Sequence, residues 1–254
     1  MYKKSFIIGY PLNNPRSVPI WKAHFKKRKK NIKMNALEIN PRFFKKEFKK
    51  ITNNNDFIAT AITMPYKKLV YKYITPYNKI TSLSKSVNLV IKYKEKLLGF
   101  NTDIEAALKI IGNKRKNKIL LIGLGGTGNA FFNVLKKKYN NNQFFIITSQ
   151  NKKNQKNIKF IRKIENEMLS KIDLIINCTP LGSNLKKSYL GKSPLKINQI
   201  KKLNKKAFVF DIVYKPRKNL LSKLCSKQKI NYENGLKMNQ LQANYALKYL
   251  DKFH

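Results

Sequence analysis

A lysine and an aspartate in this sequence could together carry out proton transfer to or from a hydroxyl group. Lys67 follows an apolar segment and Pro65, and Asp103 ends the run Gly-Phe-Asn-Thr-Asp at residues 99–103. Side chains just beyond strand ends commonly line the binding crevices of α/β folds. There, a lysine close to a carboxylate could take the proton of a hydroxyl that is being oxidised. Alone, Lys67 would be interpreted as a solvated lysine, and Asp103 as a helix N-cap.

The rarity of acids makes Asp103 the more informative member of the pair. The chain has 12 Asp and Glu residues against 55 Lys and Arg residues. Any single lysine therefore carries little information, whereas each carboxylate is unusual. Asp103 also lies between a first folded segment and a stretch typical of nucleotide binding.

A glycine-rich loop downstream could hold a dinucleotide. Residues 118–122 form an apolar run that predicts a buried strand, and residues 127–139 have the apolar spacing of a helix. Between them, glycines would let the backbone approach a pyrophosphate, which the helix N-terminus attracts. The alternative is a tight turn without a ligand, which the strand–loop–helix order makes less favoured. The expected cofactor-binding residues of this loop are Gly123, Gly125, Gly126, Thr127 and Gly128.

The absence of acids after the loop favours NADP over NAD. An NAD site usually places an acid on the ribose hydroxyls near the end of the second strand. This chain has no Asp or Glu between Glu105 and Glu165. The second strand instead ends at Thr148, followed by Ser149 and Lys152, and hydroxyls and cations suit a 2′-phosphate. Because lysine is abundant everywhere, Lys152 could also reflect composition alone.

The elements that must position these residues alternate between strands and helices. This alternation predicts an α/β fold, and the half that carries the glycine loop has the βαβ order of a doubly wound sheet. The expected strands are residues 6–9, 34–39, 57–63, 86–93, 96–100, 118–122, 144–148, 173–177 and 207–212. The expected helices are residues 19–30, one starting at Pro41, one following Asp103, 127–139 and 237–253.

Composition bounds the class of protein. A length of 254 residues fits one large or two small domains, and 42% hydrophobic residues suffice for a packed core. The net charge of +43 would suit a nucleic-acid binder. The lysines are spread along the chain and form no basic tail or recognition motif, so we favour compositional drift and expect no specific nucleic-acid partner.

Few residues are available for metal binding or export. Cys178 and Cys225 do not form a CxxC pair, and His24 and His254 are the only histidines, so we expect no metal site. Glycine and proline break the first apolar run too early for a signal peptide, and no apolar run is long enough to span a bilayer. We expect a cytoplasmic protein with no membrane partner.

Eight short signatures resemble, in order, those of the shikimate dehydrogenase family over nearly the whole chain. They are Gly9-Tyr10-Pro11-Leu12 with Arg16-Ser17, Thr63-x-Pro65-x-Lys67, Ser86-Val87-Asn88, Gly99-x-Asn101-Thr102-Asp103, Gly123-x-Gly125-Gly126 with Ala130, Ile176-Asn177-Cys178-Thr179-Pro180-Leu181-Gly182, Asp211-Ile212-Val213-Tyr214-x-Pro216, and Gly235-Leu236-x-Met238 with Gln242.

The resemblance implies the reversible, NADPH-dependent reduction of 3-dehydroshikimate to shikimate, with Lys67 and Asp103 in proton transfer. It implies a substrate-binding domain, residues 1–103, to which the C-terminal helix, 236–254, returns, and an NADP-binding Rossmann domain, residues 104–235. The substrate would be held by Ser17, Thr63, Asn88, Tyr214 and Gln242. The cofactor-binding residues would further include Thr179, Ile212 and Gly235.

The sequence departs from the family pattern at four positions. Pro15 stands where a second serine is common in the carboxylate loop, and Ala61 where asparagine is usual. Ser149 stands where the family has an arginine after the second cofactor strand, which leaves the phosphate contact open. Asn219 replaces a common threonine. Lys67 and Asp103 are both retained.

Three alternatives follow from these departures and from the charge. One is a quinate/shikimate dehydrogenase with relaxed cofactor choice, and another is a drifted relic of low activity. The third is a nucleic-acid-binding protein that kept an enzyme fold. The sequence also leaves open whether the protein forms a homodimer.

The excess of lysine predicts salt-dependent stability. Mutual repulsion among like charges destabilises the compact state and is screened by salt. We therefore expect the melting temperature, measured by calorimetry, to rise between low and moderate salt. An unchanged melting temperature would contradict this expectation.

Overall fold

The chain forms two compact units that share two helices. The computed structural model describes residues 2–112 and 117–254; Met1, the first residue of the expected substrate domain, lies outside them. Unit 1 comprises Met1–Ala106 and Leu241–His254, and unit 2 comprises Ala107–Gln240. Both boundaries fall inside helices, α4 (Thr102–Ile111) and α9 (Gly235–Phe253), so no loop marks them. That unit 1 binds substrate and unit 2 binds cofactor stays a prediction.

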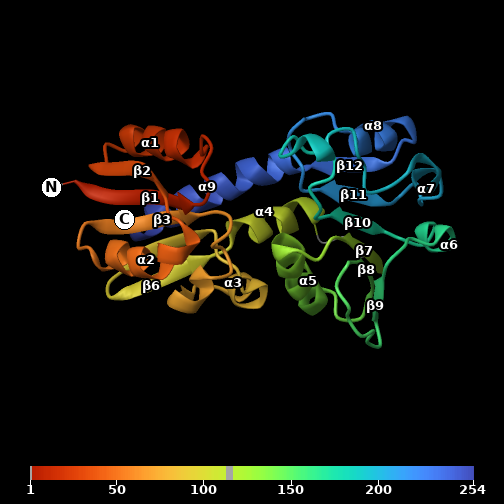
Figure 1. Ribbon diagram of the computed structural model, residues 1–254, viewed down its shortest axis with the longest axis horizontal. Helices are drawn as coiled ribbons and strands as arrows, with labels where there is room; N and C mark the ends of the chain where they lie inside the picture. The colour runs from red at the N-terminus through yellow and green to blue at the C-terminus, as the bar shows by residue number, and fades with distance from the viewer. Residues whose placement is uncertain (1, 113–116) are drawn as a thin grey trace. The chain divides into compact units, whose positions relative to one another are not determined.

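A mixed sheet forms the centre of unit 1. Its strand order is β2-β1-β3-β5-β6-β4 (Figure 1). The strands β1, β2 and β3 run parallel, and β5 is antiparallel to both β3 and β6. The strands are β1 (Lys3–Gly9), β2 (Ile32–Glu38), β3 (Phe57–Ile62), β4 (Thr75–Pro76), β5 (Leu89–Tyr93) and β6 (Lys96–Phe100). The strand expected over residues 86–93 begins only at Leu89.

Helices cover both faces of this sheet. Helices α1 and α2 lie on opposite sides of it (Figure 1). On one side, Trp21 and Phe25 of α1 pack in one buried cluster with Leu250 of α9. On the other, Phe44 and Phe48 of α2 form a second buried cluster. Burial of each such side chain contributes roughly 1.5–3 kcal/mol, so the two clusters fix the layers. The helical segments are α1 (Ser17–Lys27), η1 (Pro41–Phe43), α2 (Phe44–Asn53), η2 (Val70–Tyr73) and α3 (Lys79–Ser84).

Unit 2 is a doubly wound parallel sheet, as predicted. The strand order is β12-β11-β10-β7-β8-β9, and all neighbours are parallel. This order reverses between β7 and β10, which is the topological switch point where such folds bind ligands. The strands are β7 (Lys118–Ile122), β8 (Gln143–Ile147), β9 (Ile158–Ile161), β10 (Leu174–Asn177), β11 (Phe208–Asp211) and β12 (Asn231–Asn234).

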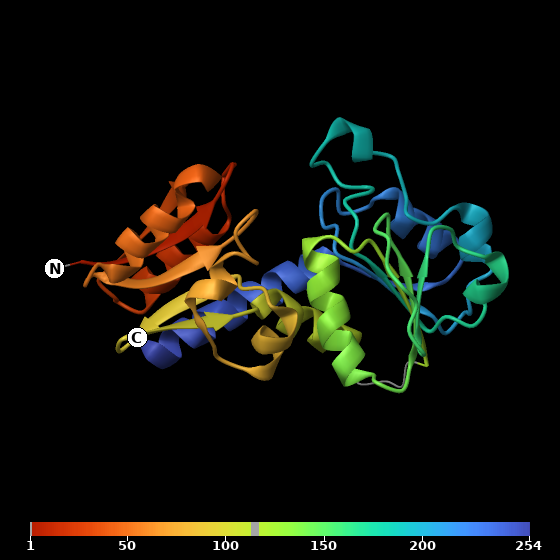
Figure 2. The same ribbon diagram turned by 60° about the horizontal axis from the view of Figure 1, so that its bottom comes forward.

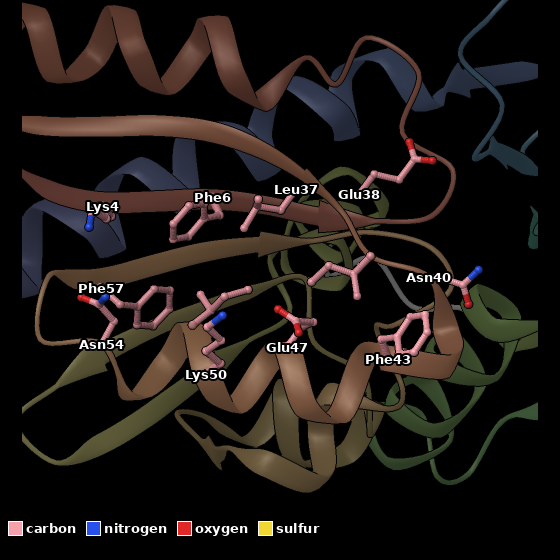
Figure 3. A pocket seen from close by; sticks show the side chains of 12 residues that line it. Lys4, Phe6, Leu37, Glu38, Asn40, Phe43, Glu47, Lys50, Asn54 and Phe57 are labelled. Atoms are coloured by element: carbon pink, nitrogen blue, oxygen red, sulfur yellow. The ribbon is translucent and has the colours of Figure 1, made fainter.

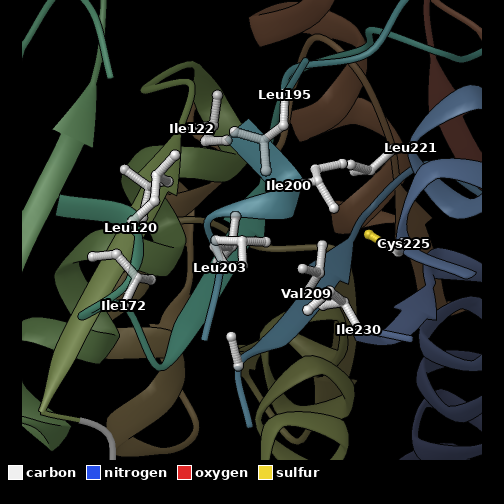
Figure 4. Packing of buried hydrophobic residues seen from close by; sticks show 13 residues of the cluster. Leu120, Ile122, Ile172, Leu195, Ile200, Leu203, Val209, Leu221, Cys225 and Ile230 are labelled. Atoms are coloured by element: carbon white, nitrogen blue, oxygen red, sulfur yellow. The ribbon is translucent and has the colours of Figure 1, made fainter. Parts of the chain in front are cut away.

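Apolar residues fill both faces of the second sheet. Helix α5 lies on one face (Figure 2). There, Phe131 contacts Phe210 with ring centroids 6.1 Å apart. On the other face, Leu120 and Val209 of the strands pack with Ile200 and other helical residues (Figure 4). The helical segments are α5 (Gly126–Lys138), α6 (Asn166–Leu169), η3 (Lys187–Tyr189), α7 (Ile197–Lys201) and α8 (Leu220–Lys227). Within residues 2–112 and 117–254, no helix has the length and apolar character needed to cross a membrane.

A partly buried carboxylate anchors the C-terminal helix inside unit 1. Glu105 accepts hydrogen bonds from Asn78 Nδ2 at 2.5 Å and from the Tyr249 hydroxyl at 3.1 Å. Burial raises the pKa of Glu105, and the hydrogen bonds from Asn78 and Tyr249 offset this only in part. A desolvated carboxylate thus connects α4 to the part of α9 that belongs to unit 1.

The raised pKa of Glu105 predicts that the free energy of unfolding depends on pH. Protonated Glu105 contributes its full stabilisation to the folded state below the ordinary glutamate pKa of about 4.3. This contribution is lost as the pH rises through the raised pKa that the residue has in the folded protein. Relative to E105Q, the wild type should therefore lose unfolding free energy as pH rises from that range. Urea unfolding at several pH values measures this, with E95Q, at an exposed turn, as the control. The same pH trend in both variants would contradict the prediction.

Candidate active site

The predicted proximity of Lys67 and Asp103 is confirmed. Lys67 Nζ lies 2.7 Å from Asp103 Oδ2, and both residues belong to unit 1. Their side chains are 33% and 19% exposed, so the pair is partly shielded yet open to solvent on one side. Lys67 lies in the turn after β3, and Asp103 lies in the first turn of α4. An ammonium and a carboxylate in direct contact at a surface opening can exchange protons with a bound hydroxyl.

The turn that carries Lys67 is anchored at two points. The preceding residue, Tyr66, is buried, stacks on Phe44 with ring centroids 4.0 Å apart, and donates its hydroxyl hydrogen to the Ile39 carbonyl. The carbonyl of Lys67 itself accepts a hydrogen bond from the Val87 amide at 2.8 Å. A lysine with four rotatable bonds is thus attached to a fixed piece of backbone, which distinguishes it from the solvated lysines.

Asn101, not Asp103, caps helix α4. Asn101 Oδ1 accepts a hydrogen bond from the Ile104 amide at 3.1 Å, while its Nδ2 donates to Ser84 Oγ and to the Ser86 carbonyl at 3.0 Å each. The N-cap interpretation of Asp103 is therefore wrong, because a residue two positions earlier already meets that requirement. Asp103 remains in the first helical turn, where the helix dipole favours its charge, and its carboxylate reaches Lys67.

Three polar side chains form a connected network in the same unit. The Thr102 amide donates to Asn88 Oδ1 at 2.8 Å, and Asn88 Nδ2 donates to Thr102 Oγ1 at 2.8 Å. Gln242 Oε1 accepts from Asn88 Nδ2 at 3.4 Å and from Thr102 Oγ1 at 3.3 Å. The network thus joins two of the expected substrate-binding residues, Asn88 and Gln242. Sequence reasoning assigned no role to Thr102, although it precedes Asp103.

Thr63 and Ser17 follow parallel strands at the same edge of the unit 1 sheet. The Thr63 amide donates to the Ile8 carbonyl at 2.9 Å, which continues the pairing of β1 with β3. Gly9 approaches so closely that a Cβ there would lie 2.4 Å from Thr63 Cγ2. Ser17 begins helix α1 after the loop that follows β1. A glycine is required at position 9 because the two loops pack without a gap.

The glycine loop of unit 2 has the geometry that a pyrophosphate requires. Gly123 has a φ of +92°, and a Cβ on Gly128 would lie 2.0 Å from the Gly123 carbonyl oxygen. These two glycines allow the tight turn and the close packing of α5 against it. At Gly125 and Gly126, by contrast, a Cβ would meet no atom within 4 Å, so the space beside them is open. Thr127 follows in the first turn of α5, whose N-terminal amides face anions.

A buried network orients the Thr179 loop beside the glycines. Asn177 Oδ1 accepts from the Thr179 hydroxyl at 2.7 Å and from its amide at 3.0 Å, and Asn177 Nδ2 donates to Asp211 Oδ1 at 2.9 Å. A Cβ on Gly123 would lie 2.8 Å from Thr179 Cγ2, so the expected cofactor residues Gly123 and Thr179 are neighbours. In the sequence, Asn177 and Asp211 were recognised only as members of two family signatures, and this positioning role was not predicted.

Asp211 is satisfied by four donors, one of which is the unusual Asn219. Asn219 Nδ2 donates to Asp211 Oδ2 at 2.8 Å, the Tyr232 hydroxyl donates at 3.0 Å, and the Val213 amide donates to Oδ1 at 3.0 Å; the fourth donor is Asn177. Burial raises the pKa of Asp211, which these donors partly offset. Asn219 also caps α8 through the Ser222 amide, so the departure from threonine is accommodated by two interactions. Nothing in the sequence pointed to Tyr232.

The remaining predicted residues lie in unit 2. A Cβ on Gly235 would lie 2.2 Å from the Ile212 carbonyl oxygen, which places these two expected cofactor residues in contact. Tyr214 lies shortly after Ile212, in the loop after β11. Thr148 is buried at the end of β8, Ser149 is exposed, and Lys152 lines a nearby hollow. Tyr214 is the one expected substrate-binding residue that lies outside unit 1.

A separate hollow of unit 1 contains none of the expected site residues. It has a volume of about 560 Å³ and lies between β1, β2 and α2, with Phe6, Leu37 and Phe57 on its floor (Figure 3). Glu38 and Glu47 contribute carboxylates to its lining. The presence of a hollow therefore does not by itself locate the residues expected to carry the chemistry.

The fold and these side chains define a dinucleotide-dependent dehydrogenase with two α/β units. A profile for the shikimate dehydrogenase substrate binding domain matches residues 7–90. A shikimate dehydrogenase (NADP(+)) of Pelagibacter ubique is 30% identical, over 96% of this chain and 92% of the relative. Its counterpart from Clostridium botulinum is 29% identical, over 95% and 93%.

A solved structure gives the same result. A shikimate dehydrogenase crystallised in complex with NADP+ superposes with a TM-score of 0.81 and 25% identity, over 99% of this chain and 90% of that one. The chain belongs to the shikimate dehydrogenase family.

The glycine loop predicts that two glycines respond oppositely to alanine. G128A would force a methyl group against the Gly123 carbonyl and should lower the unfolding free energy by about 1–3 kcal/mol. G126A, where the space is open, serves as the matched control and should leave stability unchanged or slightly raised. Urea unfolding measures both variants. Equal losses would show that the close contact between loop and helix does not limit stability.

Proposed function

We propose that this protein catalyses the reversible, NADP-dependent conversion of 3-dehydroshikimate and shikimate through Lys67 and Asp103. The observation that carries the proposal is the 2.7 Å contact between these two side chains. The polar network of Asn88, Thr102 and Gln242, which lies in the same unit, supports it. The relatives named above, which are NADP-dependent shikimate dehydrogenases, support the choice of substrate and cofactor.

Lys67 acts as the proton donor in the direction of reduction. As the ring carbonyl becomes an alcohol, its oxygen needs a proton, and the ammonium of Lys67 gives it. In the reverse direction the neutral amine takes the hydroxyl proton. Because 33% of the Lys67 side chain is exposed, water can return or remove that proton between turnovers.

Asp103 orients the lysine through a direct ion pair. Its Oδ2 contacts Lys67 Nζ, which leaves the other carboxylate oxygen to accept a hydrogen bond from the reacting hydroxyl. The Asn101 cap fixes the first turn of α4 and therefore the direction of the Asp103 side chain. Asp103 therefore contributes to alignment, which matters because reacting atoms must approach to about 3–3.5 Å.

The other expected residues bind the substrate. Asn88 Nδ2 donates a hydrogen bond to Gln242 Oε1, which leaves Gln242 Nε2 as the group that would meet a ring hydroxyl. Thr63 contributes a hydroxyl close to the turn of Lys67, and Ser17 binds the carboxylate at the start of α1. Tyr214 of unit 2 completes the set. Several short polar contacts of this kind suit a small polyhydroxylated acid.

The residues of unit 2 fit NADP. The open space at Gly125 and Gly126 and the N-terminus of α5 suit the pyrophosphate. From the family resemblance, Thr179, Ile212 and Gly235 would contact the nicotinamide side. When held by these residues, NADPH would supply the hydride for the reduction. The chain has no acidic side chain directly after the second strand of unit 2, where an acid would meet the ribose of NAD.

The remaining expectations belong to the same proposal. We place the enzyme in the cytoplasm and leave a homodimer as an alternative to a monomer. A relaxed quinate/shikimate dehydrogenase is the second candidate, motivated by Pro15 and Ser149. A specific role in nucleic-acid binding rests on the net charge alone, and binding by charge alone should fade at about 200 mM salt.

Activity with four substrate pairs tests the proposal. Purified protein is assayed with shikimate and with quinate, each with NADP+ and NAD+, by absorbance of the reduced cofactor. We expect the highest kcat/KM for shikimate with NADP+. Comparable values for quinate would favour the second candidate, and no turnover in any combination would refute both.

The role of Lys67 in proton transfer is tested by comparing K67A with a variant of the adjacent lysine, K68A. K67A should lower kcat by about 10²–10⁴-fold because the proton donor is lost. K68A, which removes an adjacent exposed lysine, is the matched control and should keep wild-type kcat. Both variants should retain the wild-type circular dichroism spectrum. Activity in K67A equal to that of K68A would show that the mechanism is wrong.

A further inference from the structure

The residue expected to hold the cofactor phosphate is missing from its usual place. Ser149, directly after the second cofactor strand, stands where the family has an arginine. Its side chain is exposed and does not line the nearby hollow. If this enzyme prefers NADP, another group must contact the 2′-phosphate.

The neighbouring strand brings an arginine to the same place. β8 and β9 are parallel and in register, with Ile147 opposite Ile161, so the residues that follow them lie side by side. Arg162 Nη1 lies 3.4 Å from the carbonyl oxygen of Thr148, and Arg162 Nη2 donates to Asn151 Oδ1. The guanidinium thus lies beside the end of β8, although it is far along the chain from Ser149.

Arg162 lines a hollow of about 320 Å³ together with two lysines. The lining residues are Thr148, Gln150, Asn151, Lys152, Lys153, Phe160, Ile161 and Arg162. None of these residues is acidic, so no carboxylate of the lining competes for the cations. The hollow is positively charged by the three side chains Lys152, Lys153 and Arg162.

This hollow adjoins the glycine loop. Gln150 Nε2 donates to the Leu124 carbonyl at 3.0 Å, and the Gln150 amide donates to Thr148 Oγ1 at 3.1 Å. A pyrophosphate at the glycine loop places the adenosine ribose near the end of the second strand of such a unit. The 2′ position of the ribose of a bound NADP would therefore lie near this hollow.

We propose that Arg162, at the end of β9, determines specificity for NADP by binding the 2′-phosphate, in place of the arginine absent at Ser149. A guanidinium has five N–H donors, and only two are directed to Thr148 and Asn151, so a phosphate can be bound by those that remain. Lys152 and Lys153 add charge but no fixed geometry. The proposal rests on the proposed function, because it concerns the cofactor of that reaction.

Binding of nucleotide fragments tests the proposal apart from catalysis. Titration calorimetry compares 2′,5′-ADP with 5′-AMP on the wild type, R162Q and K163Q. Lys163 is the exposed neighbour and does not line the hollow, so K163Q removes the same charge from the surface. R162Q should weaken 2′,5′-ADP binding by about tenfold to hundredfold and leave 5′-AMP binding within about twofold. K163Q should change neither by more than about twofold.

Kinetics then connects the residue to cofactor choice. R162Q should raise KM for NADP+ by a similar factor, with KM for NAD+ and kcat close to the wild type. Equal effects of R162Q and K163Q, or equal effects on NADP+ and NAD+, would overturn the proposal. Wild-type turnover with shikimate and NADP+ decides the proposed function separately, so either idea can fail without the other.

Discussion

A few carboxylates organise the polar structure of a chain that has an excess of cations. Asp103 binds Lys67, Glu105 anchors α9 through Tyr249, and Asp211 gathers four donors beneath the loop of Thr179. Asp251 near the C-terminus lies within 3.3 Å of a histidine, an arginine and a lysine. With only 12 acids in 254 residues, these contacts use a large share of the carboxylates that the chain has.

Position, and not residue type, distinguishes Lys67, the proposed proton donor, from the other lysines. The backbone on either side of Lys67 is fixed by the buried Tyr66 and by the Val87 amide. Its partner is oriented by a helix that begins correctly because Asn101 caps it. The apolar clusters around Phe44 and Trp21 therefore serve the chemistry indirectly, since they hold the strands whose ends carry these residues.

Long, strongly patterned elements could be predicted from the sequence, and short ones could not. The apolar run of β7 and the glycine loop after it fix a strand, a turn and a helix from local composition. Strand β4 has 2 residues and β12 has 4, and neither is apolar enough to form without the sheet that it joins. Helix α7, with 5 residues, is likewise stabilised by the buried Ile200 and not by its own propensity.

The sequence by itself determined the α/β order, the place of the dinucleotide loop and the residue types of the proton-transfer pair. These features depend on the backbone and side-chain properties of residues that are close together in the sequence. The sequence also predicted that Lys67 and Asp103 lie close together, which the structure confirms. Only the tertiary structure decided that Asn101 and not Asp103 caps α4, and that Arg162 lies beside Thr148. Each of these contacts depends on how strands pair and loops pack across the chain, because residues distant in sequence become neighbours only when a sheet is assembled in register.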